Sequence, residues 1–431
     1  MAEFKTVRGM RDFLPEEAKL LRRVEGRARE VARLYGYGEI VTPVVESYEL
    51  LSAKAGEEVK SRMFAFKDLG GRDVALRPEF TASVARLVAT TLRNEPRPFR
   101  LFSVGSIYRY DEPQRGRYRE FWQTNYELMG SSRPEADAEI LLLTNSLMQA
   151  AGLNRFAFKV GHVGVLRGIL TQEKLMDKVQ SAVMQLMDKK QYDHAFKLVE
   201  SAGVSEECVL TLRKLVDTKG SEVLEVVDRI IELVKDYGKS VEAARNLGEI
   251  LDLVLKSGCE VDMSVDAGFA RGLEYYTGMI FEVYVPCMDI ALGGGGRYDR
   301  LIELFGGDST PAVGVAHGVD RMMLALQRAD GKAAGKAGME KTVLVVPIME
   351  ELRGEALRVS RVLREAGVSV EVEVMGRKVA KALEDADRRK ISYAVIIGER
   401  EFKEGAVVVR NLTRREQSTV KVEDVAEAVK S

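Results

Sequence analysis

Apolar residues are spaced in two ways along the first 160 residues, and the two spacings predict different elements. Residues 14–35 carry them at helical intervals up to Gly36, so we expect a helix there. Residues 100–110 and 121–129 have the composition of strands, and the polar stretch 111–120 lies between them. This pattern predicts two antiparallel strands joined by a loop.

The middle of the chain is predicted to be helical. No proline occurs between residues 135 and 285, and side chains such as Val226, Ile230 and Val234 recur at helical spacing. We therefore expect a mostly helical segment at 165–255. It lies between two blocks rich in glycine and aromatic residues, so we interpret it as an insertion.

A linker rich in glycine, alanine and lysine at 329–340 separates this part from the rest. The continuous apolar run that follows, 341–347, is typical of a strand buried on both faces. Helix-like and strand-like stretches then alternate, which predicts an α/β module at 341–431. The further elements expected in it are helices at 350–366 and 378–389 and strands at 368–374, 392–398 and 406–410.

Composition narrows the class of protein. The 431 residues suffice for two or three domains, and 65 Lys and Arg nearly balance 66 Asp and Glu, so a polyanionic partner requires a local basic patch. Three cysteines without a CxxC pair and three scattered histidines argue against disulfides, a zinc site and a histidine-dependent triad. No apolar run is long enough for a membrane span, and the start lacks the apolar core of a signal peptide. We therefore expect a cytoplasmic protein.

The densest local charge lies at 93–119, which holds seven arginines, no lysine and three acids. A guanidinium clamps phosphate through two parallel hydrogen bonds. Arg109 is near the end of a predicted strand, where its side chain can be held rigidly. Arg115, Arg117 and Arg119 follow on the loop. This arrangement suits a nucleoside triphosphate, the end of a nucleic acid, or both, although a solvated basic hairpin has the same residues.

Polar residues nearby also suggest a ligand site. Gln123 and Glu127 lie on one face of the return strand, the face toward which Arg109 points on the neighbouring strand. An acid and an amide there suit an amine or a nitrogen heterocycle, although an ordinary solvent-facing strand shows the same alternation. Thr81 follows Glu79 at the start of a predicted helix, where it serves either a small polar ligand or helix capping.

Two glycine-rich blocks follow the insertion. In Arg271-Gly-Leu-Glu-Tyr-Tyr-Thr-Gly278, the arginine and the paired tyrosines supply charge and hydrogen bonds at a glycine-lined surface. The block 292–299 contains four consecutive glycines, which allow close backbone approach to a ligand, and neither block is a P-loop. Residues 312–326 predict strand, turn and helix, with Arg321 early in the helix. Together these blocks predict one anion-binding active site.

The same residues resemble a known family. Residues 99–130, with the core Tyr-Arg-Tyr-Asp-Glu-Pro-Gln-Arg-Gly-Arg-Tyr-Arg-Glu-Phe, resemble motif 2 of class II aminoacyl-tRNA synthetases, and 311–326 resembles motif 3. The stretch that begins at 37–43 resembles motif 1, which builds the dimer interface of that family. The block 271–276 with the glycine run after it is similar to that of histidyl-tRNA synthetases in particular, and the likeness covers essentially the whole chain.

This resemblance implies an α+β architecture. A class II catalytic domain on an antiparallel sheet occupies 1–164 and 256–328, with the helical insertion 165–255 between the two parts. The α/β module at 341–431 is expected to bind the anticodon. The implied activity is ATP-dependent ligation of L-histidine to tRNA(His) through histidyl-adenylate, by a homodimer. Mg²⁺ is expected to accompany ATP, but no residue cluster identifies metal ligands.

The resemblance also implies roles for individual residues. The two expected at the α-phosphate, with catalytic roles, are Arg109 and Arg271. Those expected to bind ATP are Arg109, Asp111, Arg117 and Arg321. Those expected to bind histidine are Glu79, Thr81, Gln123, Glu127, Arg271, Tyr275 and Tyr276. Of these, Glu127 and Tyr276 are expected at the two imidazole nitrogens. Candidates for contact with the acceptor end of tRNA are Gln114 and Arg115.

Other classes share parts of this pattern. A regulatory subunit of ATP phosphoribosyltransferase typically lacks the C-terminal module and the block at 271–276. Glu127 and the paired tyrosines argue against a class II synthetase for threonine, proline or glycine. A tRNA-binding or sensor pseudo-enzyme is expected to have lost catalytic arginines. The sequence departs from many relatives at Phe80, where they have glycine, so we expect a shifted contour beside Glu79.

Overall fold

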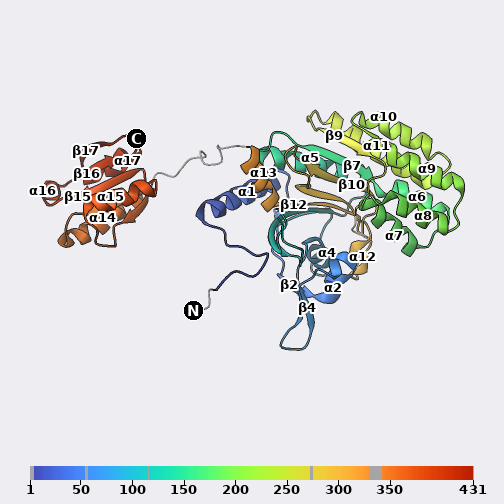
Figure 1. Ribbon diagram of the computed structural model, residues 1–431, viewed down its shortest axis with the longest axis horizontal. Helices are drawn as coiled ribbons and strands as arrows, with labels where there is room; N and C mark the ends of the chain where they lie inside the picture. Colours follow the sequence, from blue (N-terminus) through green and yellow to red (C-terminus); the bar gives the residue numbers. More distant parts are fainter. Residues whose placement is uncertain (1–3, 54–56, 115, 272–274, 330–341, 431) are drawn as a thin grey trace. The chain divides into compact units, whose positions relative to one another are not determined.

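The computed structural model describes residues 4–53, 57–114, 116–271, 275–329 and 342–430. The chain divides into two units, at 1–331 and 332–431 (Figure 1). Almost all of the expected linker lies outside the described residues. None of the described helices is long and apolar enough to cross a membrane.

A nine-stranded sheet forms the frame of the first unit. Its neighbours are antiparallel except β1 with β5 and β7 with β9. This confirms the expected antiparallel frame. In spatial order the strands are β1 (Gly38–Glu39), β5 (Phe99–Tyr108), β6 (Glu120–Met129), β12 (Ala312–Gly318), β11 (Gly293–Arg297), β10 (Met279–Tyr284), β7 (Ala157–His162), β9 (Met263–Asp266) and β8 (Lys219–Gly220).

The two faces of β6 have different surroundings. Its even-numbered side chains face α1 (Pro15–Leu34) and α5 (Pro134–Ala151). The Tyr126 hydroxyl donates to the Ala28 carbonyl at 2.8 Å, and the His317 ring lies between the hydroxyls of Thr124 and Thr144, 3.2 Å from each. This side is a closed core, and burial lowers the pKa of His317 to about 3. The odd-numbered side chains are left to build a site on the other face.

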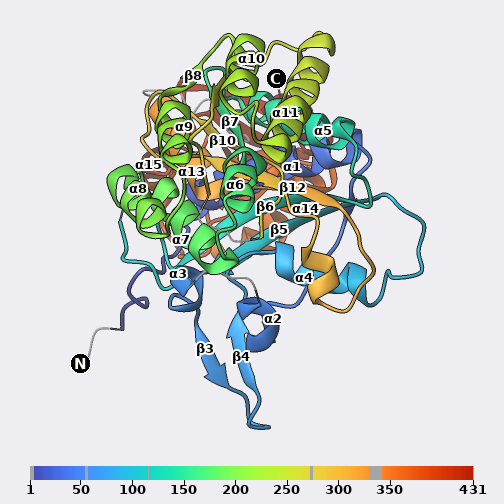
Figure 2. The ribbon, with the colours of Figure 1, turned by 90° about the vertical axis from the view of Figure 1, so that its right-hand side faces the viewer.

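A smaller sheet stands beside the main one. It has the order β2 (Val45–Ser47), β4 (Asp73–Leu76), β3 (Ala65–Lys67), and Figure 2 shows β3 and β4 projecting from the body of the unit. Short helices α2 (Tyr48–Ser52) and α3 (Glu57–Lys60) lie along this segment. Helix α4 (Thr81–Ala89) follows β4 and packs against α12 (Leu301–Leu304).

The middle of the chain is helical, as predicted, and it also extends the sheet. Its helices are α6 (Val163–Gln172), α7 (Asp177–Asp188), α8 (Tyr192–Ser201), α9 (Glu206–Asp217), α10 (Val223–Leu233) and α11 (Gly238–Lys256). Between α9 and α10, strand β8 pairs with β9 at the edge of the main sheet. A two-residue strand leaves no periodic signal, so the sequence pattern did not predict it.

The second unit is a five-stranded sheet with helices on both faces, and its strand order is β14, β13, β15, β16, β17. Along β13, Val343 and Val345 pack with α14 and α17, whereas Leu344 and Val346 pack with α15. Burial of both faces explains the continuous apolar run. The bounds are β13 (Thr342–Pro347), α14 (Arg353–Glu365), β14 (Ser369–Val372), α15 (Val379–Arg388), β15 (Tyr393–Ile397), α16 (Glu399–Lys403), β16 (Ala406–Asn411), β17 (Glu416–Lys421) and α17 (Val425–Lys430), with 3₁₀ turns at Glu350–Leu352 and Val422–Asp424.

Candidate active site

A cavity of about 230 Å³ opens on the odd-numbered face of β6. Strands β10, β11 and β12 and the first turns of α4 and α13 (Val319–Ala329) complete its walls. The predicted site residues that line it are Glu79, Thr81, Arg109, Asp111, Arg117, Gln123, Arg271, Tyr275, Tyr276 and Arg321. Glu127 lies beneath the lining, and the exposed Gln114 does not line it. Arg115 lies outside the described residues.

Glu127 forms the buried floor. Its Oε1 accepts hydrogen bonds from the Thr81 hydroxyl at 2.7 Å and from the Asn125 amide at 3.0 Å, and its Oε2 accepts one from the Tyr298 hydroxyl. The carboxylate occupies space beside Gly314 of β12, where any side chain would overlap it. Burial raises the pKa of Glu127 to about 7, although the three donors and especially the tyrosine oppose the rise.

The start of α4 forms the wall next to this floor. Thr81 is the first residue of the helix, but its hydroxyl donates to the floor carboxylate and caps no backbone group, so Thr81 serves the site. Beside it, the Tyr275 hydroxyl donates to Glu79 at 3.3 Å. Burial raises the pKa of Glu79, against the opposing charges of Arg109 and Arg271. The Gln123 Oε1 atom is buried and has no hydrogen-bond partner in the described structure, which leaves an acceptor for a ligand.

Phe80, which was expected to shift the contour beside Glu79, does not line the cavity. It is buried, and the Arg77 guanidinium lies 4.3 Å from the centre of its ring. The Arg77 side chain also donates to the Thr42 carbonyl at 2.9 Å. Phe80 therefore anchors the turn that carries Glu79 and is not among the residues that line the cavity.

Arginines form the opposite wall. Arg109 donates to the Pro78 carbonyl at 2.9 Å and Arg321 to the Ala291 carbonyl at 2.8 Å. Within the described chain, neither forms an ion pair with a carboxylate. Burial, together with the positive charges of Arg109 and Arg117, lowers the pKa of Arg321. Backbone carbonyls thus fix two guanidiniums whose charges are left for an anion.

Arg271 lies across the cavity from β5. It donates to the Phe281 carbonyl at 2.9 Å, and its Nη1 is 3.9 Å from a Glu282 oxygen. Its guanidinium occupies the space above Gly294, where a side chain would overlap it. The glycine run, expected to admit a ligand, is therefore strand β11, and its missing side chains also make room for protein groups. Gly294 still lines the cavity.

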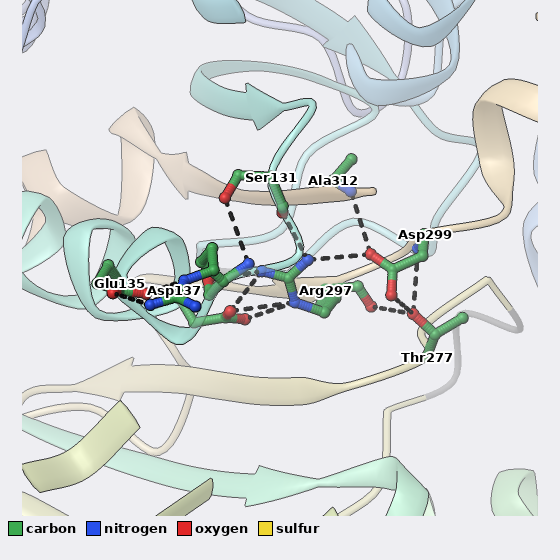
Figure 3. A network of polar contacts seen from close by, with 8 residues as sticks. Ser131, Glu135, Asp137, Thr277, Arg297, Asp299 and Ala312 are labelled. Carbon is green, nitrogen blue, oxygen red and sulfur yellow. Dashed lines mark hydrogen bonds and ion pairs between the residues drawn. The ribbon is translucent and has the colours of Figure 1, made fainter. Parts of the chain in front are cut away.

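A buried polar network supports this wall from behind (Figure 3). Arg297, which follows the glycine run, bonds both carboxylate oxygens of Asp137 and donates to Asp299 at 3.0 Å. Asp299 in turn contacts the Thr277 hydroxyl and accepts the Ala312 N–H. Because Thr277 directly follows the paired tyrosines, the network holds their turn against β11 and α5.

Sequence reasoning missed some residues of the site. Tyr298 lines the cavity and holds Glu127, and Asp320 and Glu282 line the side that carries the arginines. Tyr298 lies within the block 292–299 and Asp320 directly precedes Arg321, but sequence alone assigned neither of them a partner. No group of three or more His, Cys, Asp or Glu among the described residues forms a metal site.

The raised pKa of Glu127 predicts a pH dependence of stability. A protonated carboxyl is favoured in the folded state up to about pH 7, whereas in the unfolded chain it ionises near pH 4.5. Its contribution to stability is therefore complete below about pH 4.5 and is lost as the pH rises to about 7. Between these two pH values, the free energy of unfolding of the wild-type protein should fall by up to about 3 kcal/mol relative to that of Glu127→Gln.

The measurement is denaturant unfolding followed by the fluorescence of Trp122, the single tryptophan, which lies on β6. The control variant Glu49→Gln removes an exposed carboxylate and should keep the wild-type slope against pH. Parallel curves for wild type and Glu127→Gln would contradict the assignment.

Comparison with known proteins agrees with this architecture. The family model for histidyl-tRNA synthetase matches residues 9–322, and the model for an anticodon binding domain matches residues 342–431. Histidine–tRNA ligase of Methanocaldococcus jannaschii is 42% identical over 98% of each chain. That of Saccharolobus solfataricus is 38% identical over 100% of this chain and 99% of its own.

Solved structures show the same fold. Histidyl-tRNA synthetase from Nostoc superposes with a TM-score of 0.81 at 24% identity, covering 100% of this chain and 99% of its own. A Bacillus halodurans protein described as an ATP phosphoribosyltransferase regulatory subunit/histidyl-tRNA synthetase gives 0.77 at 27% identity, covering 89% and 97%. The match of the synthetase family model over most of the chain and the full-length similarity to the archaeal ligases lead to one conclusion: this chain belongs to the histidyl-tRNA synthetase family.

Proposed function

We propose that this protein joins L-histidine to tRNA(His) in two steps, with ATP as the second substrate. The observation that carries the proposal is the division of one cavity into two halves. Glu79, Gln123 and the floor over Glu127 suit an amino acid with a basic ring, and the facing arginines suit a polyphosphate. The same cavity also has the paired tyrosines that a phosphate-binding site alone does not need.

In the first step, a carboxylate oxygen of histidine attacks the α-phosphorus of ATP and pyrophosphate leaves. We assign Arg109 and Arg271 to the α-phosphate, where negative charge develops in the transition state. Both line the cavity, and they come from different parts of the fold: Arg109 directly follows β5, and Arg271 lies between β9 and β10. Arg321 and Arg117 are assigned to the departing polyphosphate, and Asp111 lies beside them.

Histidine recognition follows from the other half of the cavity. The α-ammonium group is a donor, and Glu79 and the unpartnered Gln123 oxygen are acceptors. The hydroxyl of Tyr276, and Glu127 through its bonded neighbours Thr81 and Tyr298, are assigned to the imidazole end. An amino acid without two ring nitrogens would make no hydrogen bonds at this end of the cavity, where water would be displaced without replacement, and this is a basis for rejection.

In the second step, a hydroxyl of the 3′-terminal ribose attacks the acyl carbon of histidyl-adenylate, forming the ester and releasing AMP. The acceptor end must approach over the residues between β5 and β6, so Gln114 and Arg115 remain proposed contacts. Asp111, Glu282 and Asp320, the acids near the arginines, already have cationic or hydroxyl partners and do not form a cation site. We therefore propose that Mg²⁺ arrives bound to the phosphates of ATP, and that the reaction takes place in the cytoplasm.

The adenylation step can be tested by ATP–pyrophosphate exchange with each of the twenty amino acids. We expect exchange with histidine alone. Arg271→Ala should lower kcat about 100- to 1,000-fold, because one preorganised charge is lost, with a much smaller change in the Kd of histidine. Arg213→Ala, which removes a surface arginine of the insertion, is the control.

The outcomes separate the alternatives. Equal losses in kcat and histidine affinity for Arg271→Ala would exclude its transition-state role. Exchange with another amino acid would exclude the assigned specificity. No exchange with any amino acid would favour a regulatory or tRNA-binding protein.

For the anticodon, the second unit offers a cavity of about 460 Å³ beyond the carboxyl ends of β13 and β14. Ligands of α/β sheets bind at such ends. Exposed apolar side chains, among them Ile348, Leu357 and Val374, give unpaired bases a surface to pack on. Lys378 suits a phosphate, whereas the Arg377 guanidinium is already paired with Glu373 and Asp385. We propose this cavity as the anticodon site.

Val374→Asp should therefore raise the KM for tRNA(His) at least tenfold in aminoacylation, because a carboxylate would repel the phosphates and displace a base. ATP–pyrophosphate exchange should stay unchanged, since that reaction does not use tRNA. Thr419→Asp places the same charge on the exposed strand β17 at the other edge of the sheet, as a control. Equal effects of the two variants would rule out this location.

We also propose that two copies of this chain form a homodimer. Directly after the edge strand β1, Val41 is 92% exposed, and Val44 and Val45 are also exposed. Phe66, on β3, and Leu69, between β3 and β4, are exposed apolar residues as well. This surface includes the stretch that resembles motif 1, and apolar surface of this kind marks interfaces.

Val41→Asp should shift the protein from dimer to monomer in sedimentation velocity, because it places a charge in an apolar interface. The control Leu210→Asp alters an exposed leucine on α9 of the insertion and should leave the mass unchanged. A monomeric wild-type protein, or a dimer unaffected by Val41→Asp, would contradict the proposed surface.

A further inference from the structure

The residues before the first helix are bound to the nucleotide side of the cavity. We name residues 8–13 the N-terminal strap. The Gly9 carbonyl accepts the Arg119 N–H at 2.8 Å. Gly9 has a φ of +84°, and a side chain there would crowd those of Arg119 and Pro113. Two reasons therefore disfavour any residue other than glycine at position 9: the positive φ angle, and the lack of space beside Arg119 and Pro113.

Arg11 makes the central contacts of the strap. Its guanidinium lies between two rings, 4.4 Å from the centre of Phe13 and 3.8 Å from that of Tyr118, and it forms an ion pair with Asp320. Phe13 in turn packs edge-to-face on Trp122 of β6, with ring centres 5.2 Å apart. Stacking and charge pairing of this kind need a planar guanidinium, which lysine cannot replace.

Asp320 connects this cluster to the cavity. It is 6% exposed, lines the cavity and accepts the Trp122 N–H at 2.6 Å. It also directly precedes Arg321 in the first turn of α13. Burial raises the pKa of Asp320, and the Trp122 N–H and Arg11 oppose that rise. Without Arg11, a buried carboxylate would stand uncompensated beside the wall assigned to the polyphosphate.

We infer that Arg11 is a positioning residue for ATP. By pairing with Asp320 and stacking on Tyr118, it holds the first turn of α13 and the end of the arginine-rich loop in register, and it compensates the negative charge of Asp320, the residue before Arg321. Arg11 itself does not line the cavity, so its effect on ATP is transmitted through Asp320 and Tyr118. This inference depends on the proposed use of ATP.

The test is histidine-dependent ATP–pyrophosphate exchange by the full chain. Arg11→Met should raise the KM for ATP at least tenfold and leave the KM for histidine within twofold. Adding Asp320→Asn to Arg11→Met should recover part of that loss, because it removes the uncompensated charge. Arg100→Met, which breaks the half-exposed ion pair with Glu139 outside the cavity, should leave both KM values unchanged.

Several outcomes would overturn the inference. They are an unchanged KM for ATP in Arg11→Met, a parallel rise in both KM values, and failure of Asp320→Asn to restore ATP binding. If Arg11→Met does not fold by Trp122 fluorescence, Arg11→Lys, which keeps the charge but loses the stacked guanidinium, must show a smaller rise in the KM for ATP while the KM for histidine stays unchanged. A wild-type protein that exchanges with no amino acid would instead contradict the proposed function itself.

Discussion

One buried guanidinium, that of Arg297, connects the elements on which the site depends. Arg297 is 6% exposed, and its guanidinium bonds Asp137 on α5 and Asp299, two residues after β11 ends. The backbone carbonyl of Arg297 accepts the Thr277 N–H. Breaking a buried pair of this kind costs about 3–5 kcal/mol, because the remaining charge is left uncompensated. The wall with the paired tyrosines is therefore connected through Thr277 to the buried pair of Arg297 and Asp137.

The central strands carry glycines at the positions where charged side chains from other segments lie against the sheet. Gly294 leaves room for the guanidinium of Arg271, and Gly314 leaves room for the carboxylate of Glu127. In both cases the charged side chain belongs to a different strand or loop, and it fills the space that a side chain of the glycine would occupy. Substituting either glycine would displace a functional side chain without removing any contact of the glycine's own.

Much of this arrangement could be predicted from the sequence, since alternation and helical spacing are local. The strands expected at 100–110 and 121–129 are β5 and β6, shifted by one or two residues. Strand β17 escaped prediction because its residues are mostly polar and exposed, as suits an edge strand. The position of Glu127 beneath the lining depends on Gly314 in the paired strand, and the Arg11–Asp320 contact joins residues 309 apart. Such contacts between distant residues leave no periodic signal.

In the proposed reaction, the unequal charges of the two halves of the cavity also orient the substrates. A free amino acid carries an ammonium and a carboxylate. Once the ammonium lies at Glu79 and Gln123, the carboxylate is directed toward Arg109 and Arg271, where the α-phosphate is expected. On the far side, repulsion among Arg109, Arg117 and Arg321 is large enough to contribute to the lowered pKa of Arg321. A triphosphate relieves that repulsion as it binds, so the same charges that destabilise the empty cavity favour its occupation by ATP.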